Sequence, residues 1–208
     1  MLHLETIEPR TFSLLKTLQA INELKDFFLV GGTALALKHG HRISEDIDLF
    51  GHVAFDKEAI IKQLETSFGK DFEYAGNPAK WAVFCYIQNI KVDIILYDHP
   101  LIANPDIIDD IRMYSDKDIA AMKVNAILGR GKKKDFWDIY ELLKVFTLTQ
   151  IIDFYFAKFS RQQLLISIPE ALCYFIDAEE SEDPVSLKRQ RWEEIKKFIQ
   201  KEVNKFLK

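Results

Sequence analysis

The chain has 208 residues, of which 48% are hydrophobic, 29% charged and 12% aromatic, and its formal net charge is −4. This composition is typical of a globular protein and excludes the disordered and low-complexity classes. No apolar run approaches the roughly 18 residues of a membrane-spanning helix, the first residues do not resemble an export signal, and Cys85 and Cys173 lack metal-site spacing. We therefore expect a cytoplasmic protein with reduced thiols, and its net acidity argues against a whole surface devoted to nucleic acid.

The segment before about residue 110 is predicted to mix helices and strands, because its apolar residues alternate between helical and strand spacing. In chain order we expect a helix from Pro9, a strand at 27–30, a tight turn at Gly31-Gly32, a short helix closed near Gly40, a strand at 47–50, a helix capped by Asp56 and ended by Gly69, a short strand at 72–74, and strands at 81–87 and 90–97. Gln88-Asn89 between the last two strands predicts an antiparallel hairpin.

The remainder of the chain is predicted to be helical. We expect helices at 115–128, 135–146, 149–159, 162–175 and from Ser186 onward. The stretch 188–208 carries eight basic and three acidic residues, which we interpret as the solvated face of a helix whose apolar side packs on its own chain.

Asp46 and Asp48 form an Asp-x-Asp pattern on a predicted strand. Because strand side chains alternate, both carboxylates should lie on one face while Ile47 and Leu49 point into the core. Two like charges repel unless a cation lies between them, and Mg²⁺ is usually held by a few carboxylates together with substrate phosphates. Taken alone, however, such a short pattern is more often a strand end with solvated acids.

Two other features give this pattern a context. Gly31-Gly32-Thr33 follows a strand, and the backbone N–H groups of such a turn can approach an anion, although a plain tight turn explains the glycines equally well. Asp93 lies among apolar residues, which favours a nearby partner unless its strand is at the edge of the sheet. Three acids on neighbouring strands are what a two-metal phosphoryl-transfer site requires.

The segment from Gly31 to Phe50, GGTALALKHGHRISEDIDLF, resembles the signature of the nucleotidyltransferase superfamily, and HRISEDIDLF resembles the AbiEii/AbiGii toxins of type IV toxin–antitoxin and abortive-infection systems. The resemblance continues in order through KVD (91–93), AMKVNA (121–126), KDFWDIY (134–140) and YFIDAE (174–179). It implies an α+β fold with a nucleotidyltransferase-like mixed sheet and flanking helices at 1–110, followed by a helical domain at 111–208. One departure is Gly32, where classical members often have serine, and Thr33 could supply the missing hydroxyl.

The resemblance also implies an activity. A Mg²⁺-dependent nucleotidyltransferase would transfer a nucleoside monophosphate from a nucleoside triphosphate to a hydroxyl of tRNA or protein, and a cognate antitoxin would be its partner. The rival functions are an aminoglycoside-type enzyme that modifies a small molecule, and a non-catalytic relative that binds a nucleotide or a partner protein. An acidic acceptor cleft would favour the first rival, because cationic sugars need carboxylates.

Site residues follow from the same resemblance. The implied metal ligands are Asp46, Asp48 and Asp93, and the implied catalytic residues are these three with Lys123 and Asp138. Contacts to the triphosphate are expected from Gly31, Gly32, Thr33, Lys123 and Arg130.

The residues themselves leave the roles in the helical half open. Lys123 and Arg130 lie within the apolar stripe of their helix, so each needs an ion pair, a phosphate or access to water. Asp138 lies opposite the apolar stripe of its own helix and could face solvent or the cleft.

Arg42 and Ser44 lie between the glycine turn and the two acids, and we include both among the candidate nucleotide contacts. The forked donors of Arg42 suit a triphosphate, although a surface salt bridge with Glu45 is an equal contender. His39 and His41 have no companions at zinc spacing, so we expect neither to bind a metal.

Overall fold

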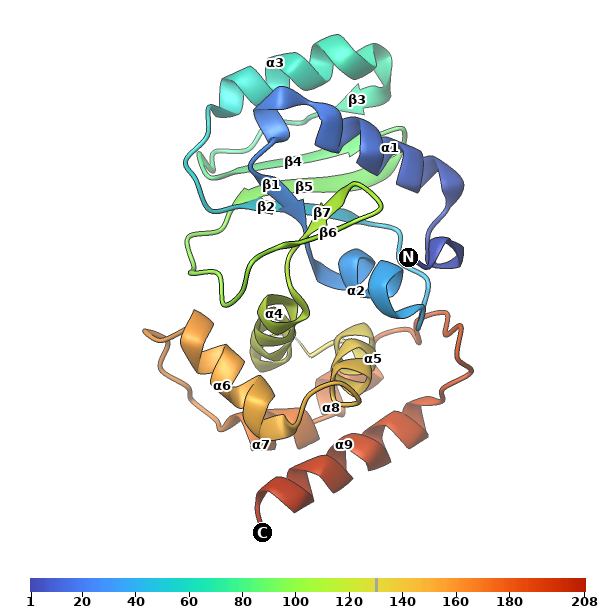
Figure 1. Cartoon of the computed structure of the whole chain (residues 1–208), viewed down its shortest axis with the longest axis vertical. Helices are drawn as coiled ribbons and strands as arrows, with labels where there is room; N and C mark the ends of the chain where they lie inside the picture. The colour runs from blue at the N-terminus through green and yellow to red at the C-terminus, as the bar shows by residue number, and fades with distance from the viewer. Residues whose placement is uncertain (130) are drawn as a thin grey trace. The chain divides into compact units, whose positions relative to one another are not determined.

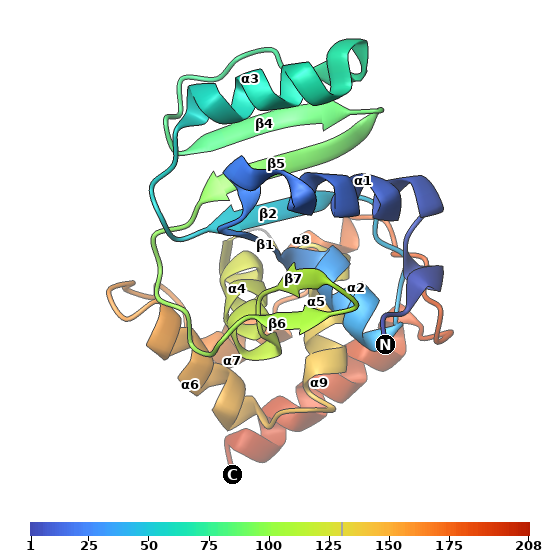
Figure 2. The same ribbon diagram turned by 45° about the horizontal axis from the view of Figure 1, so that its top comes forward.

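The computed structural model describes residues 1–129 and 131–208, and these fall into two units (Figures 1 and 2). The first unit comprises residues 1–38, 44–99 and 105–114, and the second comprises 39–43, 100–104 and 115–208. Compared with the expected boundary at residue 110, the structure assigns 111–114 to the first unit and two short segments to the second. No helix in the described part of the chain is long and apolar enough to cross a bilayer.

A mixed sheet forms the centre of the first unit. Its seven strands in the described residues have the order β3-β4-β5-β2-β1-β7-β6. The strands are β1 (Phe27–Leu29), β2 (Ile47–Gly51), β3 (Phe72–Glu73), β4 (Ala82–Ile87), β5 (Ile90–Leu96), β6 (Asp106–Ile108) and β7 (Ile111–Met113). The pairs β2–β5 and β1–β7 are parallel, and the other neighbours are antiparallel. The mixed sheet predicted from the sequence is therefore confirmed.

The helices from Pro9 and after Asp56 begin where the sequence predicts, whereas the helix expected after the Gly31-Gly32 turn already begins at Gly31. They are α1 (Pro9–Ala20), α2 (Gly31–His39) and α3 (Lys57–Phe68), with short 3₁₀ turns at Leu4–Thr6, Asn22–Leu24 and Gly69–Asp71. The Asp56 carboxylate accepts a hydrogen bond from the N–H of Ala59, and Gly69 ends α3 with a φ of +52°. In chain order, α2 connects β1 to the segment before β2 (Figure 1).

One predicted hairpin is present, and a second one was missed. Gln88 and Asn89 have φ values of 54° and 62°, as a two-residue turn between β4 and β5 requires. Asp109 and Asp110 adopt the same left-handed conformation between β6 and β7. Each of these strands has three residues, too few for a period-2 pattern to be visible in the sequence.

The second unit is helical, as predicted. Its helices are α4 (Asp116–Gly129), α5 (Lys133–Leu142), α6 (Leu148–Lys158), α7 (Ile168–Cys173), α8 (Ile176–Glu179) and α9 (Trp192–Phe206). Three expected bounds were wrong. The expected 162–175 helix is only α7, because Ser167 and Glu170 form a capping box that starts it late. Helix α9 starts after Arg191, whose N–H donates to the Glu194 carboxylate over 3.3 Å, and α5 ends at Leu142.

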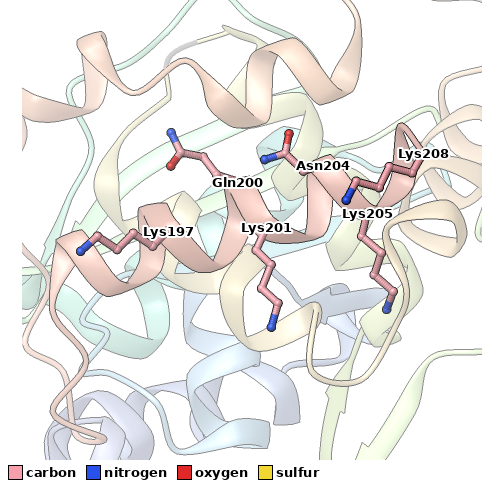
Figure 3. Close-up of a pocket in the computed structure, with 6 residues that line it drawn as sticks. All are labelled: Lys197, Gln200, Lys201, Asn204, Lys205 and Lys208. Atoms are coloured by element: carbon pink, nitrogen blue, oxygen red, sulfur yellow. The ribbon is translucent and has the colours of Figure 1, made fainter.

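Helix α9 packs on its own chain through one face. Trp192, Ile195, Ile199 and Val203 are buried, and the Trp192 indole stacks on Trp137 with ring centroids 5.7 Å apart. The expected docking is thus confirmed within the second unit. The opposite face carries lysines beside amide side chains along a shallow hollow (Figure 3); its lining residues are Lys197, Gln200, Lys201, Asn204, Lys205 and Lys208.

Candidate active site

The glycine turn of the first unit lies directly against a carboxylate. Gly31 begins α2 with a φ of +70°, which favours glycine. A Cβ atom added at Gly31 would lie 2.8 Å from Oδ2 of Asp48, so the position has no room for a larger residue. The turn is held to the strand by the N–H of Val30, which donates to the carbonyl of Asp48 over 2.9 Å. Sequence segments 31–33 and 46–48 therefore form one local structure.

The strands β2 and β5 bring two of the predicted acids side by side. They run parallel with Asp48 opposite Asp93, and the flanking pairs Ile47–Val92 and Leu49–Ile94 are fully buried. Register partners in a sheet project to the same face, so the Asp48 and Asp93 carboxylates share a face. Because β5 lies between β4 and β2, the alternative that Asp93 belongs to an edge strand is wrong.

A lysine accompanies these acids. Nζ of Lys91 donates to Oδ2 of Asp93 over 2.5 Å, and the two side chains are 42% and 14% exposed. Partial burial lowers the pKa of Lys91, but its hydrogen bond to Asp93 and the charges of Asp93, Asp48 and Asp46 outweigh this and raise it. The other carboxylate oxygen of Asp93, Oδ1, is buried and has no hydrogen-bond partner among the described residues. Lys91 was not among the predicted site residues, although it lies within the KVD motif.

Two hydroxyl groups support the segment that leads into β2. Oγ1 of Thr33 donates to the carbonyl oxygen of Asp46 over 2.5 Å and lies 2.9 Å from Oγ of Ser44. Thr33 is 1% exposed. In this structure its hydroxyl therefore positions Asp46, and it does not face solvent as a substitute for the serine of classical members.

A hollow of about 380 Å³ opens beside Asp46 in the first unit. Its charged lining is mixed, because Glu8, Glu45 and Asp46 face it together with Arg10 and Lys91. Arg10 and Glu8 form an ion pair of 2.8 Å. The hollow is therefore not the acidic cleft that a cationic sugar would need.

The predicted site residues of the second unit meet in a buried ion cluster. Asp138 accepts hydrogen bonds from Nε2 of His41 at 2.7 Å and from Nε and Nη2 of Arg42 at 2.8 and 2.9 Å, and it lies 2.6 Å from Nζ of Lys123. Lys123 also donates to Asp135 over 3.0 Å. These five residues come from segment 39–43, α4 and α5, and all of them are buried.

This cluster decides between several alternatives. Asp138 does not face solvent, and Arg42 is 3% exposed, so the interpretation of Arg42 as a surface side chain paired with Glu45 is wrong. Lys123 was expected to need an ion pair, a phosphate or access to water. In the structure it forms buried ion pairs with Asp135 and Asp138. Arg130 lies outside the described residues.

Burial and charge compete in setting the pKa values of the cluster. Burial raises the pKa of Asp138, but the charges of Arg42 and Lys123 and the hydrogen bonds that it accepts hold it well below its usual value. The pKa of Lys123 is raised, since Asp138 and Asp135 outweigh its desolvation. Burial lowers the pKa of His41, and its hydrogen bond to Asp138 only partly opposes this. His41 was expected only not to be a metal ligand, and its place in the cluster could not be found from spacing.

The comparisons with known proteins decide the family. The family described as "Nucleotidyl transferase AbiEii toxin, Type IV TA system" matches residues 13–207. The chain belongs to this family. An uncharacterized protein of Aquifex aeolicus is 34% identical in an alignment of 190 residues that covers 88% of this chain and 88% of that one. The resemblance stated from the sequence is thereby confirmed, and the protein is a nucleotidyltransferase of the AbiEii toxin family.

Solved structures agree on the fold. MenT4, a nucleotidyltransferase toxin from Mycobacterium tuberculosis, matches with a TM-score of 0.61 at 12% identity, over 95% of this chain and 86% of that one. JHP933 from Helicobacter pylori matches with a TM-score of 0.55 at 16% identity, over 95% and 92% of the two chains. At such low identities the likeness shows a nucleotidyltransferase fold and does not extend to substrates.

The acids of the first unit suit a magnesium ion in their chemistry. Carboxylate oxygens are the ligands that Mg²⁺ prefers, and the buried Oδ1 of Asp93 lacks any other partner among the described residues. In the described part of the chain, no three His, Cys, Asp or Glu side chains are already grouped as a metal site. Ion binding by these acids would therefore require their carboxylates to turn toward a common point.

Proposed function

We propose that this AbiEii-family enzyme transfers a nucleoside monophosphate from a nucleoside triphosphate to an acceptor hydroxyl, with the phosphate and carboxylate chemistry carried by the first unit. The observation that supports this proposal is the register of Asp48 with Asp93 beside the Gly31 turn. The two carboxylates can bind a cation, and the N–H groups of the neighbouring strand-to-helix turn can bind an anion. A metal–triphosphate complex carries both kinds of charge, so it fits this arrangement.

Each part of this arrangement has a chemical role in the proposal. The N–H groups at the start of α2 receive the triphosphate, and Thr33 keeps the Asp46 segment in place through its 2.5 Å hydrogen bond. Asp46, Asp48 and Asp93 would hold Mg²⁺, which supplies charge neutralisation for the phosphates and the leaving pyrophosphate. The acceptor oxygen bonds to the α-phosphorus, the bond from that phosphorus to the bridging oxygen breaks, and the hydroxyl proton passes to a carboxylate of the site, for which Asp93 is the candidate.

The cluster of the second unit has a different role in this proposal. Lys123 and Asp138 are catalytic candidates by family resemblance, yet each has buried partners of opposite charge within its own unit. We assign them to holding segment 39–43 against α4 and α5, so that they act as positioning residues. Arg42 belongs to the same framework.

The acceptor in this proposal is a hydroxyl of a tRNA or of a protein. Membership of a type IV toxin–antitoxin family supports a cognate antitoxin, encoded nearby, as the partner. The mixed charges of the hollow beside Asp46 do not favour the aminoglycoside-type rival.

The experiment is transfer of label from each α-³²P-labelled nucleoside triphosphate to total RNA and, separately, to total protein in the presence of Mg²⁺. We expect Asp48→Asn to reduce transfer on the order of 10²- to 10³-fold, because it removes a charge that acts at the phosphates. The matched control is Asp98→Asn, an exposed acid of the same unit, which should transfer like the wild type.

The outcomes separate the rivals. Label that still transfers at the wild-type rate with Asp48→Asn contradicts the proposed site. Label found only in a small cationic sugar supports the aminoglycoside-type function. Absence of both transfer and metal-dependent triphosphate binding supports the non-catalytic relative.

A further inference from the structure

We propose that Lys91 is a built-in counter-ion of the carboxylate site: its ammonium group holds Asp93 while no divalent cation is bound and gives Asp93 up when a cation arrives with the nucleotide. This inference rests on the proposed function, since it concerns the same three acids. It makes Lys91 a residue that sets when the site accepts a metal.

The geometry places this lysine where a cation is needed. Lys91 and Asp93 are two residues apart on β5, so their side chains leave the same face of the strand, and Asp48 is the register partner of Asp93. The Lys91 ammonium is 2.5 Å from Oδ2 of Asp93, whereas Oδ1 has no partner among the described residues. One oxygen of Asp93 is thus held by Lys91, and the other is buried without a hydrogen-bond partner among the described residues.

A comparison with Lys123 shows why Lys91 can move. The Lys123 side chain is 7% exposed and its ammonium lies between Asp135 and Asp138, so leaving would strand two buried carboxylates. The Lys91 side chain is 42% exposed, lines the hollow beside Asp46 and has Asp93 as its close carboxylate partner. Its long stem can turn toward water or toward an incoming phosphate at small cost.

The Lys91 ammonium and a divalent cation should compete for the Asp93 carboxylate. A divalent ion that binds Asp93 brings two positive charges close to the Lys91 ammonium, and like charges a few ångströms apart repel. Metal without nucleotide should therefore bind weakly. A triphosphate supplies negative charge that can receive the displaced ammonium, so metal and nucleotide should bind cooperatively.

The test measures Mn²⁺ affinity from the electron paramagnetic resonance signal of the free ion at neutral pH, without nucleotide and then with a non-hydrolysable α,β-methylene triphosphate. We expect Lys91→Met to bind Mn²⁺ roughly tenfold or more tightly than the wild type without nucleotide, because it removes a unit charge beside the ion. Adding the analogue should tighten Mn²⁺ binding more in the wild type than in Lys91→Met. Lys91→Arg keeps the charge and should resemble the wild type.

Controls keep the result specific. Lys62→Met replaces an exposed lysine of α3 in the same unit and should leave the Mn²⁺ affinity unchanged. Asp48→Asn introduced together with Lys91→Met should abolish the gain, which places the ion at this site. Lys91→Gln is a second neutral variant, and circular dichroism melting verifies that each variant is folded.

The outcome that overturns the inference is Mn²⁺ binding by folded Lys91→Met and Lys91→Gln that is no tighter than in the wild type; absence of Mn²⁺ binding in every variant also overturns it. Failure of the proposed function is distinguishable. If the Mn²⁺ affinities shift as expected and no label is transferred to any acceptor, the counter-ion role stands and the transferase proposal is the one that fails.

Discussion

Two groups of acids in this protein differ in how their charge is balanced. Asp138 in the second unit accepts hydrogen bonds from His41 and Arg42 and also pairs with Lys123, and none of its side chain is exposed. Asp93 in the first unit has Lys91 on one oxygen and no described partner on the other. Removing one member of a fully balanced buried cluster leaves an uncompensated charge and destabilises the fold, whereas a carboxylate with an unpaired oxygen is a candidate for binding a ligand. The comparison assigns stability to the second cluster and chemistry to the first.

The largest effect should come from breaking the balanced cluster. Asp138→Asn keeps the shape of the side chain but leaves Arg42 and Lys123 buried with one fewer negative charge, so we expect a loss of about 3–5 kcal/mol in the free energy of unfolding. Urea denaturation followed by circular dichroism measures this loss. The control Asp153→Ala removes an exposed acid of α6 and should change the free energy by less than about 0.5 kcal/mol.

The opposite result would assign Asp138 a role in catalysis in place of a role in stability. If Asp138→Asn is as stable as the wild type and has lost nucleotidyl transfer, the residue acts in the chemistry and its burial is incidental. That outcome would restore the catalytic role implied by the family resemblance.

A second effect of intermediate size should appear as pH falls. The Asp138 carboxylate only accepts hydrogen bonds, so the bonded Nε2 of His41 carries the hydrogen in the neutral ring, and protonation would occur at Nδ1, which is buried without a hydrogen-bond partner among the described residues. Because the pKa of His41 is lower in the folded chain than in the unfolded chain, there is a pH range in which His41 is protonated only in the unfolded chain. The free energy of unfolding should therefore decrease as pH falls below about 6.5, by up to about 1.4 kcal/mol per pH unit.

The measurement compares unfolding in urea at pH 7.5, 6.5 and 5.5 for the wild type and His41→Gln, and the difference between their slopes isolates this group. His52→Gln, at an exposed position of the first unit, should keep the wild-type slope. Equal slopes for wild type and His41→Gln would show that folded His41 accepts its proton as readily as the unfolded chain. The lowered pKa of Asp138 acts in the same direction at more acidic pH, since its contribution is present above its unfolded pKa and is lost below it.

The two clusters also differ in how far the sequence could predict them. Asp46, Asp48 and the glycine turn are close in the chain, and the period-2 alternation of β2 predicts their common face. The position of Asp93 beside Asp48 depends on the parallel pairing of β2 with β5, which the sequence did not predict. The family resemblance implied only that Asp93 belongs to the site. In contrast, the cluster around Asp138 joins segments that are 96 residues apart, as in the pair of Arg42 with Asp138. Helical periodicity showed that Lys123 needed a partner, but only the packing of α4 on α5 identifies the partner as Asp135 and Asp138.

The smallest effect on the free energy of unfolding is expected from the exposed face of α9. Substitutions there test whether exposed charges of the second unit matter for its stability as the buried cluster does. Lys205 lies 3.8 Å from Glu202 with its side chain 75% exposed, and Lys201 faces the same hollow (Figure 3). Exposed pairs of this kind contribute little, because water already solvates both partners. We expect the double variant Lys201→Gln/Lys205→Gln to stay within about 0.5 kcal/mol of the wild type in urea denaturation. A loss comparable to that of Asp138→Asn would show that the second unit depends on its total charge, and the buried cluster would no longer explain its stability.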